Sequence, residues 1–204
     1  MSHDPTADTE ATYDLIAPAY AERTKVQPPV LQGWLDRFAT AMPAGATVAD
    51  LGCGPARDGA RLAARGLLAV GVDRSAGMLA IAAVDGLPGR VVQGDLRRLP
   101  LRTGSVDGLW SSAALLHVPR HDVPGALAEM HRVLRPGGVL GLVTALGRGE
   151  RCEEVDYAAG RHRWFVYHDA GSLRRLTGQA RFTLLAESER RMNRHWLQLL
   201  ARAQ

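Results

Sequence analysis

The sequence lacks long hydrophobic runs, and no stretch reaches the roughly 18 consecutive apolar residues that a membrane-spanning helix needs. Its opening residues, MSHDPTADTEATYD, include neither the basic nor the apolar segment of a secretory signal, so we expect no such signal. Cysteine is scarce: Cys53 and Cys152 cannot form a disulfide-rich scaffold, and neither lies among metal-ligating residues. We therefore expect a cytoplasmic protein with no bound metal and no membrane partner.

Lysine is almost absent, because Lys25 is the only lysine among 25 basic residues. The formal net charge of +4 lies within residues 148–204, whereas residues 1–147 carry as many acidic as basic side chains. A nucleic-acid-binding protein usually presents a dense basic face, so this small surplus argues against a nucleic-acid partner. The length of 204 residues fits one domain, and we expect a monomer or a homodimer.

Short apolar runs alternate with helical segments along most of the chain, a pattern typical of a parallel sheet that is covered on both faces. Residues 147–168 depart from it, since they are polar and rich in arginine, and we expect them to be irregular. Ser75 could cap the predicted helix of residues 76–84, and Asp122 could cap that of residues 123–134. The predicted strands are residues 46–51, 67–72, 91–92, 106–110, 139–144, 182–186 and 196–201, and the predicted helices are residues 56–65, 76–84, 123–134 and 172–176.

Residues 48–54, Val-Ala-Asp-Leu-Gly-Cys-Gly, predict a strand that runs into a tight glycine turn and then a helix. Gly52 and Gly54 permit a left-handed backbone and the close approach of a ligand. Asp73 ends the next predicted strand, where a carboxylate can accept hydrogen bonds from both hydroxyls of a ribose. This pattern fits two ligands, a nicotinamide dinucleotide or S-adenosylmethionine.

The residues around the turn favour S-adenosylmethionine. A dinucleotide fingerprint requires a third glycine at position 57, whereas the sequence has Arg57, which would crowd the helix against the strand. Asp50 would repel a pyrophosphate but suits the ammonium group of a methionine moiety. A Gly94-Asp95-Leu96 segment after the third predicted strand can offer a carboxylate to an adenine amino group and a backbone N–H to its ring.

In these features the chain resembles the class I S-adenosylmethionine-dependent methyltransferases, and in particular their small-molecule, type 11-like members. The resemblance covers roughly residues 10–147, through residues 13–20 and the motifs ADLGCG, GVDRSAGML, GDLRRLPL, SVDGLWSSAALLHVP and ALAEMHRVLRPGG. One departure is Ala56, which stands where the family usually has a third turn glycine. The resemblance implies a three-layer, Rossmann-like α/β sandwich whose mostly parallel seven-stranded sheet has an antiparallel C-terminal hairpin strand. Residues 1–45 would form a helical lid, residues 46–146 the cofactor-binding core, and residues 147–204 an acceptor-side segment with the last strands.

The resemblance also implies roles for individual residues. Ser111 would approach the sulfonium, and the helix from Tyr13 to Arg23 would close over the cofactor. We expect this helix to become ordered on cofactor binding and residues 1–9 to be disordered. The residues implied to bind S-adenosyl-L-methionine are Tyr13, Tyr20, Arg23, Asp50, Gly52, Cys53, Gly54, Asp73, Arg74, Met78, Asp95, Leu96 and Ser111.

His117 follows the fourth predicted strand, where the methyl acceptor must lie, and it is our candidate catalytic residue. A neutral imidazole can take a proton from a hydroxyl or ammonium acceptor, although the same position could merely line the pocket. The arginine-rich segment leaves the carboxyl end of the fifth strand and should pass over the acceptor side. The predicted acceptor-binding residues are His117, Arg151, Arg163, Trp164 and Tyr167.

Several of these residues also have an ordinary structural explanation. Asp50 and Asp95 could be turn residues, Met78 could fill the core, and Tyr13 and Tyr20, two helical turns apart, could form an apolar stripe. The predicted function is in-line methyl transfer to oxygen or nitrogen of a small-molecule acceptor, a reaction that depends chiefly on orientation. The alternatives are an RNA or protein methyltransferase and a non-catalytic S-adenosylmethionine-binding protein. The sequence identifies neither the acceptor nor the methylated atom.

Overall fold

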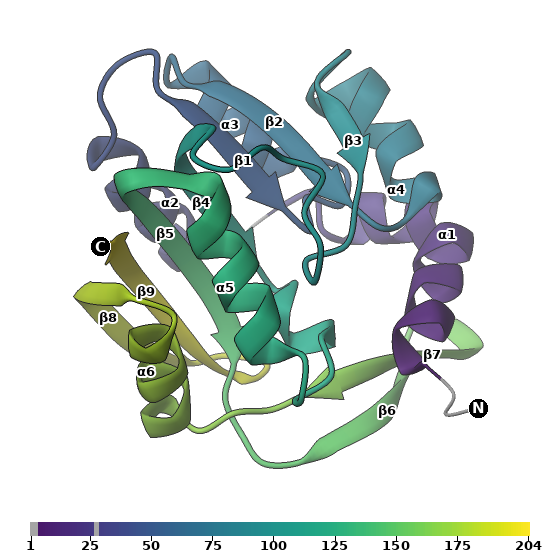
Figure 1. Cartoon of the computed structure of the whole chain (residues 1–204). Helices are drawn as coiled ribbons and strands as arrows, with labels where there is room; N and C mark the ends of the chain where they lie inside the picture. Colours follow the sequence, from purple (N-terminus) through teal and green to yellow (C-terminus); the bar gives the residue numbers. More distant parts are fainter. Residues whose placement is uncertain (1–3, 27–28) are drawn as a thin grey trace.

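A computed structural model of the chain describes residues 4–26 and 29–204, and its main feature is one large sheet. The strands of this sheet are β1 (Thr47–Leu51), β2 (Leu68–Asp73), β3 (Val91–Gln93), β4 (Val106–Ser112), β5 (Leu134–Ala145), β8 (Phe182–Arg191) and β9 (His195–Ala203). They lie in the order β3-β2-β1-β4-β5-β9-β8 (Figure 1). The first five are parallel, β9 is antiparallel to β5, and β8 is antiparallel to β9. The predicted seven-stranded, mostly parallel sheet with an antiparallel C-terminal hairpin is therefore confirmed.

Helices cover both faces of the sheet and make three layers (Figure 1). The helices of the described ranges are α1 (Pro5–Arg23), α2 (Pro29–Thr40), α3 (Arg57–Ala64), α4 (Ala76–Ile81), α5 (Val123–Val133) and α6 (Ala170–Gln179). On one face, Met130 of α5 and Leu173 of α6 pack in a common core with Leu140 of β5. On the other, Phe38 of α2 and Leu62 of α3 form a second core. None of these helices combines the length and the apolarity that crossing a membrane requires.

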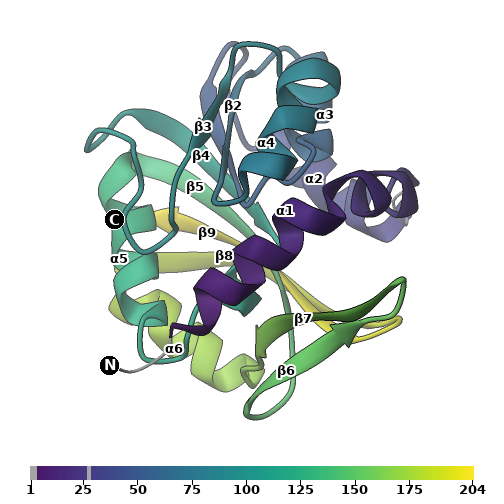
Figure 2. The same ribbon diagram turned by 90° about the vertical axis from the view of Figure 1, so that its right-hand side faces the viewer.

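The carboxyl edge of the sheet is covered by α1 and by a hairpin that stands apart from the sheet. Figure 2 shows α1 running obliquely across this edge, between α4 and the hairpin. The hairpin consists of β6 (Glu150–Val155) and β7 (Ala158–Val166), which pair in antiparallel register. Loops that follow β1, β2, β3 and β4 reach the same edge, so side chains from distant parts of the sequence meet there.

The hairpin corrects the expectation that residues 147–168 are irregular. Its sequence hides the strands because charged and small side chains occupy most of their positions, and the ribbon presents much of its surface to solvent. Only a few apolar side chains are buried, among them Val155, Phe165 and Tyr167. Backbone pairing between the two strands, rather than an alternating apolar pattern, makes this segment regular.

The helix starts agree with the sequence only in part. Ser75 caps α4 as predicted, because its hydroxyl accepts the N–H of Met78 at 3.1 Å. Asp122 does not cap α5, since its carboxylate binds Arg97 at 3.2 Å instead. The expected disorder of residues 1–9 is wrong for the described part: α1 begins at Pro5, and Asp4 caps it through the N–H of Thr6. Residues 1–3 lie outside the described residues.

Candidate functional site

Two adjoining cavities open at the carboxyl edge of the sheet, beneath α1. The first encloses about 750 Å³ and the second about 1670 Å³, in each case including space that is open to solvent. Cavities at the carboxyl ends of the strands are the usual ligand sites of open α/β sheets. Both cavities are lined by Tyr13, Tyr20, Gly52, Gly54, Ser112, Ala113 and His117, which form the boundary between them.

The turn after β1 brings backbone groups to this boundary. Gly52 has a φ of +67°, and a Cβ atom there would lie 2.2 Å from the Cβ atom of Ala114, so only glycine fits. Ala56 has a φ of 57°, the left-handed conformation that the missing third glycine would have supplied. The expected crowding by Arg57 is absent, because its guanidinium extends toward α1 and donates to the carbonyl of Ala21.

Asp73 ends β2, and its carboxylate lines the first cavity. One oxygen accepts the N–H of Gly54 at 2.8 Å, and the other accepts the N–H of Ser75 at 2.9 Å. Burial raises the pKa of this carboxyl, and the backbone N–H groups only partly oppose the shift. Because each carboxylate oxygen can accept more than one hydrogen bond, Asp73 is held in place and can still bind a ligand.

Asp50 lies behind the glycine turn and lines the second cavity. Its carboxylate accepts the N–H of Gly59 at 2.9 Å and is only 2% exposed. Burial, and then the nearby negative charge of Asp58, raise the pKa of Asp50 well above its ordinary value. No ion pair joins Asp50 to a cation within the described ranges. A ligand ammonium group would stabilise this desolvated carboxylate.

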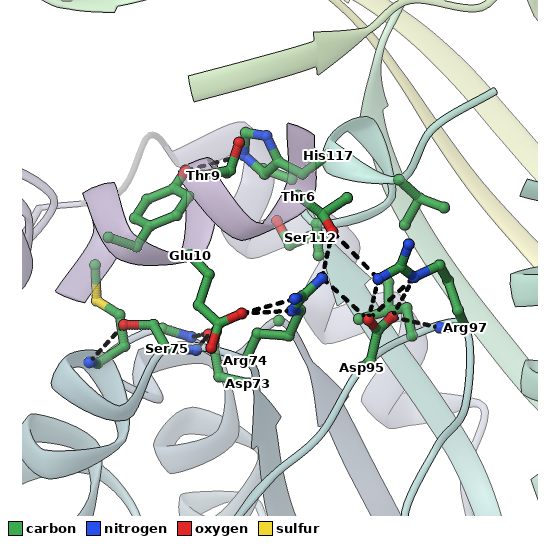
Figure 3. A pocket seen from close by; sticks show the side chains of 18 of the residues that line it. Thr6, Thr9, Glu10, Asp73, Arg74, Ser75, Asp95, Arg97, Ser112 and His117 are labelled. Atoms are coloured by element: carbon green, nitrogen blue, oxygen red, sulfur yellow. Dashed lines mark hydrogen bonds and ion pairs between the residues drawn. The ribbon is translucent and has the colours of Figure 1, made fainter. Parts of the chain in front are cut away.

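A network of charged side chains that line the first cavity joins α1 to the loop after β3 (Figure 3). Asp95 forms ion pairs with Arg97 at 2.7 Å and with Arg74 at 3.1 Å. Burial acts to raise the pKa of Asp95, but hydrogen bonds from Arg97 outweigh it and the pKa is lowered. From α1, Glu10 contacts Arg74 at 2.7 Å and Asp4 contacts Arg97 at 3.2 Å. These ion pairs hold α1 over the first cavity.

His117 and Tyr13 form a hydrogen-bonded pair at the boundary of the two cavities. The Nδ1 atom of His117 lies 2.6 Å from the carbonyl oxygen of Trp164, so this nitrogen carries the proton. The Nε2 atom therefore accepts the hydrogen bond from the Tyr13 hydroxyl, at 2.9 Å. Burial lowers the pKa of His117 to about 4. The hydrogen bond to the Trp164 carbonyl acts to raise this pKa, whereas the charges of Arg163 and Arg194 lower it further. The imidazole is neutral at physiological pH.

The β6–β7 hairpin, the turn between β8 and β9 and the start of β9 supply the outer wall of the second cavity. This wall is partly aromatic and partly charged, because rings alternate with guanidinium and carboxylate groups. Arg194 is paired with Glu153 at 2.6 Å and also lies over the ring of Phe165, 4.4 Å from its centroid. The wall residues are Glu154, Asp156, Tyr157, Arg163, Phe165, Met192, Asn193, Arg194 and Trp196.

The structure places most of the predicted site residues around these cavities. Arg23, Asp50, Cys53 and Arg163 line the second cavity. The first is lined by the predicted residues Tyr13, Tyr20, Gly52, Gly54, Asp73, Arg74, Met78, Asp95, Leu96 and His117.

Four predicted residues lie elsewhere. Ser111 is completely buried and lines neither cavity; the next residue of β4, Ser112, reaches the boundary instead. Arg151, Trp164 and Tyr167 also line neither cavity. Arg151 pairs with Glu153 at 3.0 Å, Tyr167 donates to the same carboxylate at 2.5 Å, and Trp164 contributes its carbonyl to His117. They support the wall from behind.

Sequence reasoning missed Thr6, Glu10 and Arg97 in the first cavity and Arg194 in the second. A signal existed for Arg97, because an arginine two residues after Asp95 can fold back onto that carboxylate. No local signal identifies Thr6 or Glu10, since they reach the cavity only because α1 crosses it. Within the described residues, no cluster of His, Cys, Asp and Glu could hold a metal ion.

The chain is similar to known proteins over its core. The family model of a methyltransferase domain matches residues 48–138. Trans-aconitate 2-methyltransferase of Deinococcus radiodurans is 48% identical over 98 residues, which are 47% of this chain and 36% of that protein. Malonyl-(acyl-carrier protein) O-methyltransferase of Dechloromonas aromatica is 35% identical over 176 residues, which are 83% of this chain and 63% of that protein. The chain thus spans less than two thirds of either curated relative.

A solved structure shares the whole fold. It is the 1,6-didemethyltoxoflavin-N1-methyltransferase of Burkholderia thailandensis, determined with 1,6-didemethyltoxoflavin and S-adenosylhomocysteine bound. The TM-score is 0.76 at 20% sequence identity, and the match covers 100% of this chain and 91% of that chain. At this identity the likeness establishes a common fold and no more.

Proposed function

Because the chain belongs to the class I S-adenosylmethionine-dependent methyltransferases, we propose that it transfers a methyl group from S-adenosylmethionine to oxygen or nitrogen of a small-molecule acceptor. One observation carries the proposal: the two cavities meet at Tyr13, His117 and the glycine turn, so that a cofactor whose nucleoside lies in the first cavity would present its methyl group to an acceptor in the second. The curated relatives named above, which carry the names of methyltransferases for trans-aconitate and malonyl-(acyl-carrier protein), support this class of reaction.

The first cavity has the donors and acceptors that the nucleoside part of this cofactor requires. Asp73 would accept the two ribose hydroxyls while it keeps its bonds to the backbone. Asp95 and the N–H of Leu96 would bind the adenine edge, and Arg74 would hold Asp95 in place. Met78, buried and apolar, would pack against the ring.

The glycine turn and its surroundings suit the methionine part. Gly54 leaves room beside the backbone, Gly52 allows the turn to pack against Ala114, and Asp50 offers a buried carboxylate to an ammonium group. Tyr20 lies next to Gly54, since a Cβ on that glycine would be 3.8 Å from the tyrosine ring. Cys53 lines the second cavity beside them, and burial raises the pKa of its thiol, which keeps it protonated and unreactive.

When bound, S-adenosylmethionine supplies a methyl group that its sulfonium activates toward nucleophiles. The protein then has to hold the acceptor in line and keep water away, and orientation of this kind accounts for most of the acceleration. Tyr13 and Tyr20 pack edge to face, with ring centroids 5.6 Å apart, and narrow the boundary where the transfer would take place. α1, which carries both rings, serves as the lid.

We further propose that His117 positions Tyr13 and does not act as the general base that the sequence suggested. Both of its nitrogens are already hydrogen-bonded inside the protein. If His117 took up a proton through Tyr13, it would become an imidazolium near the positive charges of Arg163 and Arg194. This protonation is unfavourable, because the pKa of His117 is only about 4. The proposed reaction therefore suits an acceptor whose attacking oxygen or nitrogen already has a free electron pair, so that the protein does not have to remove a proton first.

The proposed function is tested by incubating the protein with S-adenosylmethionine that carries a labelled methyl group and a library of small metabolites. Mass spectrometry should find the label on at least one metabolite and equimolar S-adenosylhomocysteine. Asp73→Ala should abolish the transfer, whereas Asp85→Ala, an exposed carboxylate outside both cavities, should retain it. Tight cofactor binding with no labelled product from this library, but labelled RNA or protein in a parallel assay, would overturn the small-molecule assignment.

A further inference from the structure

Arg163 is a half-buried arginine that lines the second cavity without a carboxylate partner among the described residues. Two other arginines that line the same cavity are paired: Arg23 binds Asp156, and Arg194 binds Glu153, each at 2.6 Å. Their charges are therefore satisfied within the protein. The charge of Arg163 is not.

The hydrogen bonds of Arg163 confirm that its guanidinium is incompletely satisfied. Its terminal nitrogen donates to the hydroxyl of Tyr13 at 3.3 Å, at the long end of the usual range. Its Nε atom is buried and has no hydrogen-bond partner in the described structure. A guanidinium removed from water in this way is unfavourable unless an acceptor reaches it.

The natural partner of Arg163 in the hairpin is occupied. Glu153 stands directly opposite Arg163 in the register of β6 and β7. Its carboxylate binds Arg194, Arg151 and the Tyr167 hydroxyl instead. Glu153 and Arg163 are therefore neighbours across the hairpin, but the Glu153 carboxylate is already bound by other side chains.

The surroundings of Arg163 fix its guanidinium near the place of transfer. Its Cζ atom lies 5.6 Å from the ring centroid of Tyr13 and 5.4 Å from that of Phe165. Cation–π contacts of this length hold the group in place but do not neutralise it. The hydroxyl of Tyr13, which Arg163 contacts, is the one bonded to His117 at the boundary of the cavities.

We propose that Arg163 binds a carboxylate of the methyl acceptor, so that the acceptor is a small carboxylic acid. The inference rests on the proposed function, because it names the substrate class of the same site. A planar guanidinium with a free Nε–H matches a carboxylate in geometry and charge. Glu154 lines the same cavity, and its charge opposes a dianionic phosphate more strongly than a carboxylate. The rings of Phe165 and Tyr157 suit the apolar body of such an acid.

The inference can be tested on the protein without knowing the acceptor, by using acetate as the smallest carboxylate probe. The ¹⁵N resonance of the Arg163 side-chain Nε is identified as the one that disappears in Arg163→Gln. In wild-type protein saturated with S-adenosylhomocysteine, acetate should shift this resonance saturably. Acetamide, which has nearly the same shape and no charge, should leave it in place. Inorganic phosphate should shift it less than acetate does at equal concentration.

Variants then connect binding to turnover. For a carboxylate acceptor found in the labelled library, Arg163→Gln should raise KM by about tenfold to hundredfold, the effect of losing a charge-assisted hydrogen bond. Arg163→Lys should lose less, because it keeps the charge. Arg161→Gln is the matched control, since Arg161 is exposed on the same strand and lines neither cavity.

Several results would overturn the inference. These are equal shifts with acetate and acetamide, a stronger response to phosphate, no response to any anion, or a set of acceptors that are all neutral or cationic. Calorimetry with S-adenosylhomocysteine is run on every variant. If the wild type binds S-adenosylhomocysteine but does not respond to acetate, only the role of Arg163 is contradicted. If the wild type does not bind S-adenosylhomocysteine, the proposed function is contradicted.

Discussion

Backbone groups help to fix two side chains that matter most at the site. Asp73 accepts two backbone N–H groups, and His117 donates to a backbone carbonyl. Asp73 could be predicted from the sequence because it stands at the end of a strand at a fixed distance from a glycine turn. The pairing of His117 with Tyr13 could not be predicted, since 104 residues separate them. The Trp164 carbonyl, also distant in sequence, decides which imidazole nitrogen carries the proton and which accepts a hydrogen bond.

The role of His117 is open to a direct kinetic test. If it positions Tyr13, His117→Ala should raise the KM of the acceptor and lower kcat by less than about tenfold, with kcat independent of pH from 6 to 9. A general base would instead cost about 10² to 10⁴ in kcat and leave an ionisation in the pH profile. Measuring kcat and KM across this pH range for both proteins distinguishes the two roles. Tyr13→Phe should resemble His117→Ala only if the two residues act as a pair.

The hairpin and α1 both line the second cavity, and they differ in how well the sequence predicts them. α1 could be expected from the match to a closing helix, although its start was placed too late because Asp4 and Pro5 were not read as cap and first turn. The hairpin was missed because strands with polar residues on both faces lack the period-two apolar pattern. It packs against α1 and against Trp196 of β9, contacts that no local window contains.

The ion pairs of Arg97 should control how easily α1 opens. Arg97→Gln removes its contacts with Asp4 and Asp95, so amide hydrogens in the first turns of α1 should exchange about fivefold faster in the free protein. S-adenosylhomocysteine should slow this exchange in both proteins. Arg135→Gln is the control, because Arg135 pairs with Asp107 at the opposite end of β4. Equal protection of α1 with and without the ligand would show that the helix is not a lid.

At the level of the whole molecule, the buried imidazole makes stability depend on pH. His117 has a pKa of about 4 in the folded state, against an ordinary value of 6.5. Between these values the unfolded chain binds a proton that the folded chain does not, so acidification lowers the free energy of unfolding. The stabilisation is complete above pH 6.5 and is lost as the pH falls toward 4, in total about 3 kcal/mol.

Denaturant unfolding of wild type and His117→Gln at several pH values measures this effect. The wild type should lose stability more steeply, by about 1 kcal/mol per pH unit between pH 6 and 4. His168, whose pKa burial also lowers to about 4, contributes in the same direction in both proteins and cancels in the comparison. Parallel curves for the two proteins would show that the His117 imidazole is protonated in the fold or is not buried.

The sheet order follows from the sequence better than the site does. Apolar strands separated by helices leave few arrangements, because parallel crossovers are right-handed and the strands must be covered on both faces. No such rule governs the second cavity, because its wall comes from a polar hairpin, from α1 and from the turn between β8 and β9. Local patterns therefore predicted most of the residues that line the first cavity, whereas the outer wall of the second required the folded chain.

Titration calorimetry with S-adenosylhomocysteine tests the central claim most directly. The wild type should bind one equivalent. Asp73→Ala should bind more weakly by about 2–4 kcal/mol, from two lost charge-assisted hydrogen bonds, while Asp85→Ala binds as the wild type does. NAD, titrated in the same way, should not bind. Absence of S-adenosylhomocysteine binding by the folded wild type, or tighter binding of NAD, would contradict the assignment of the first cavity.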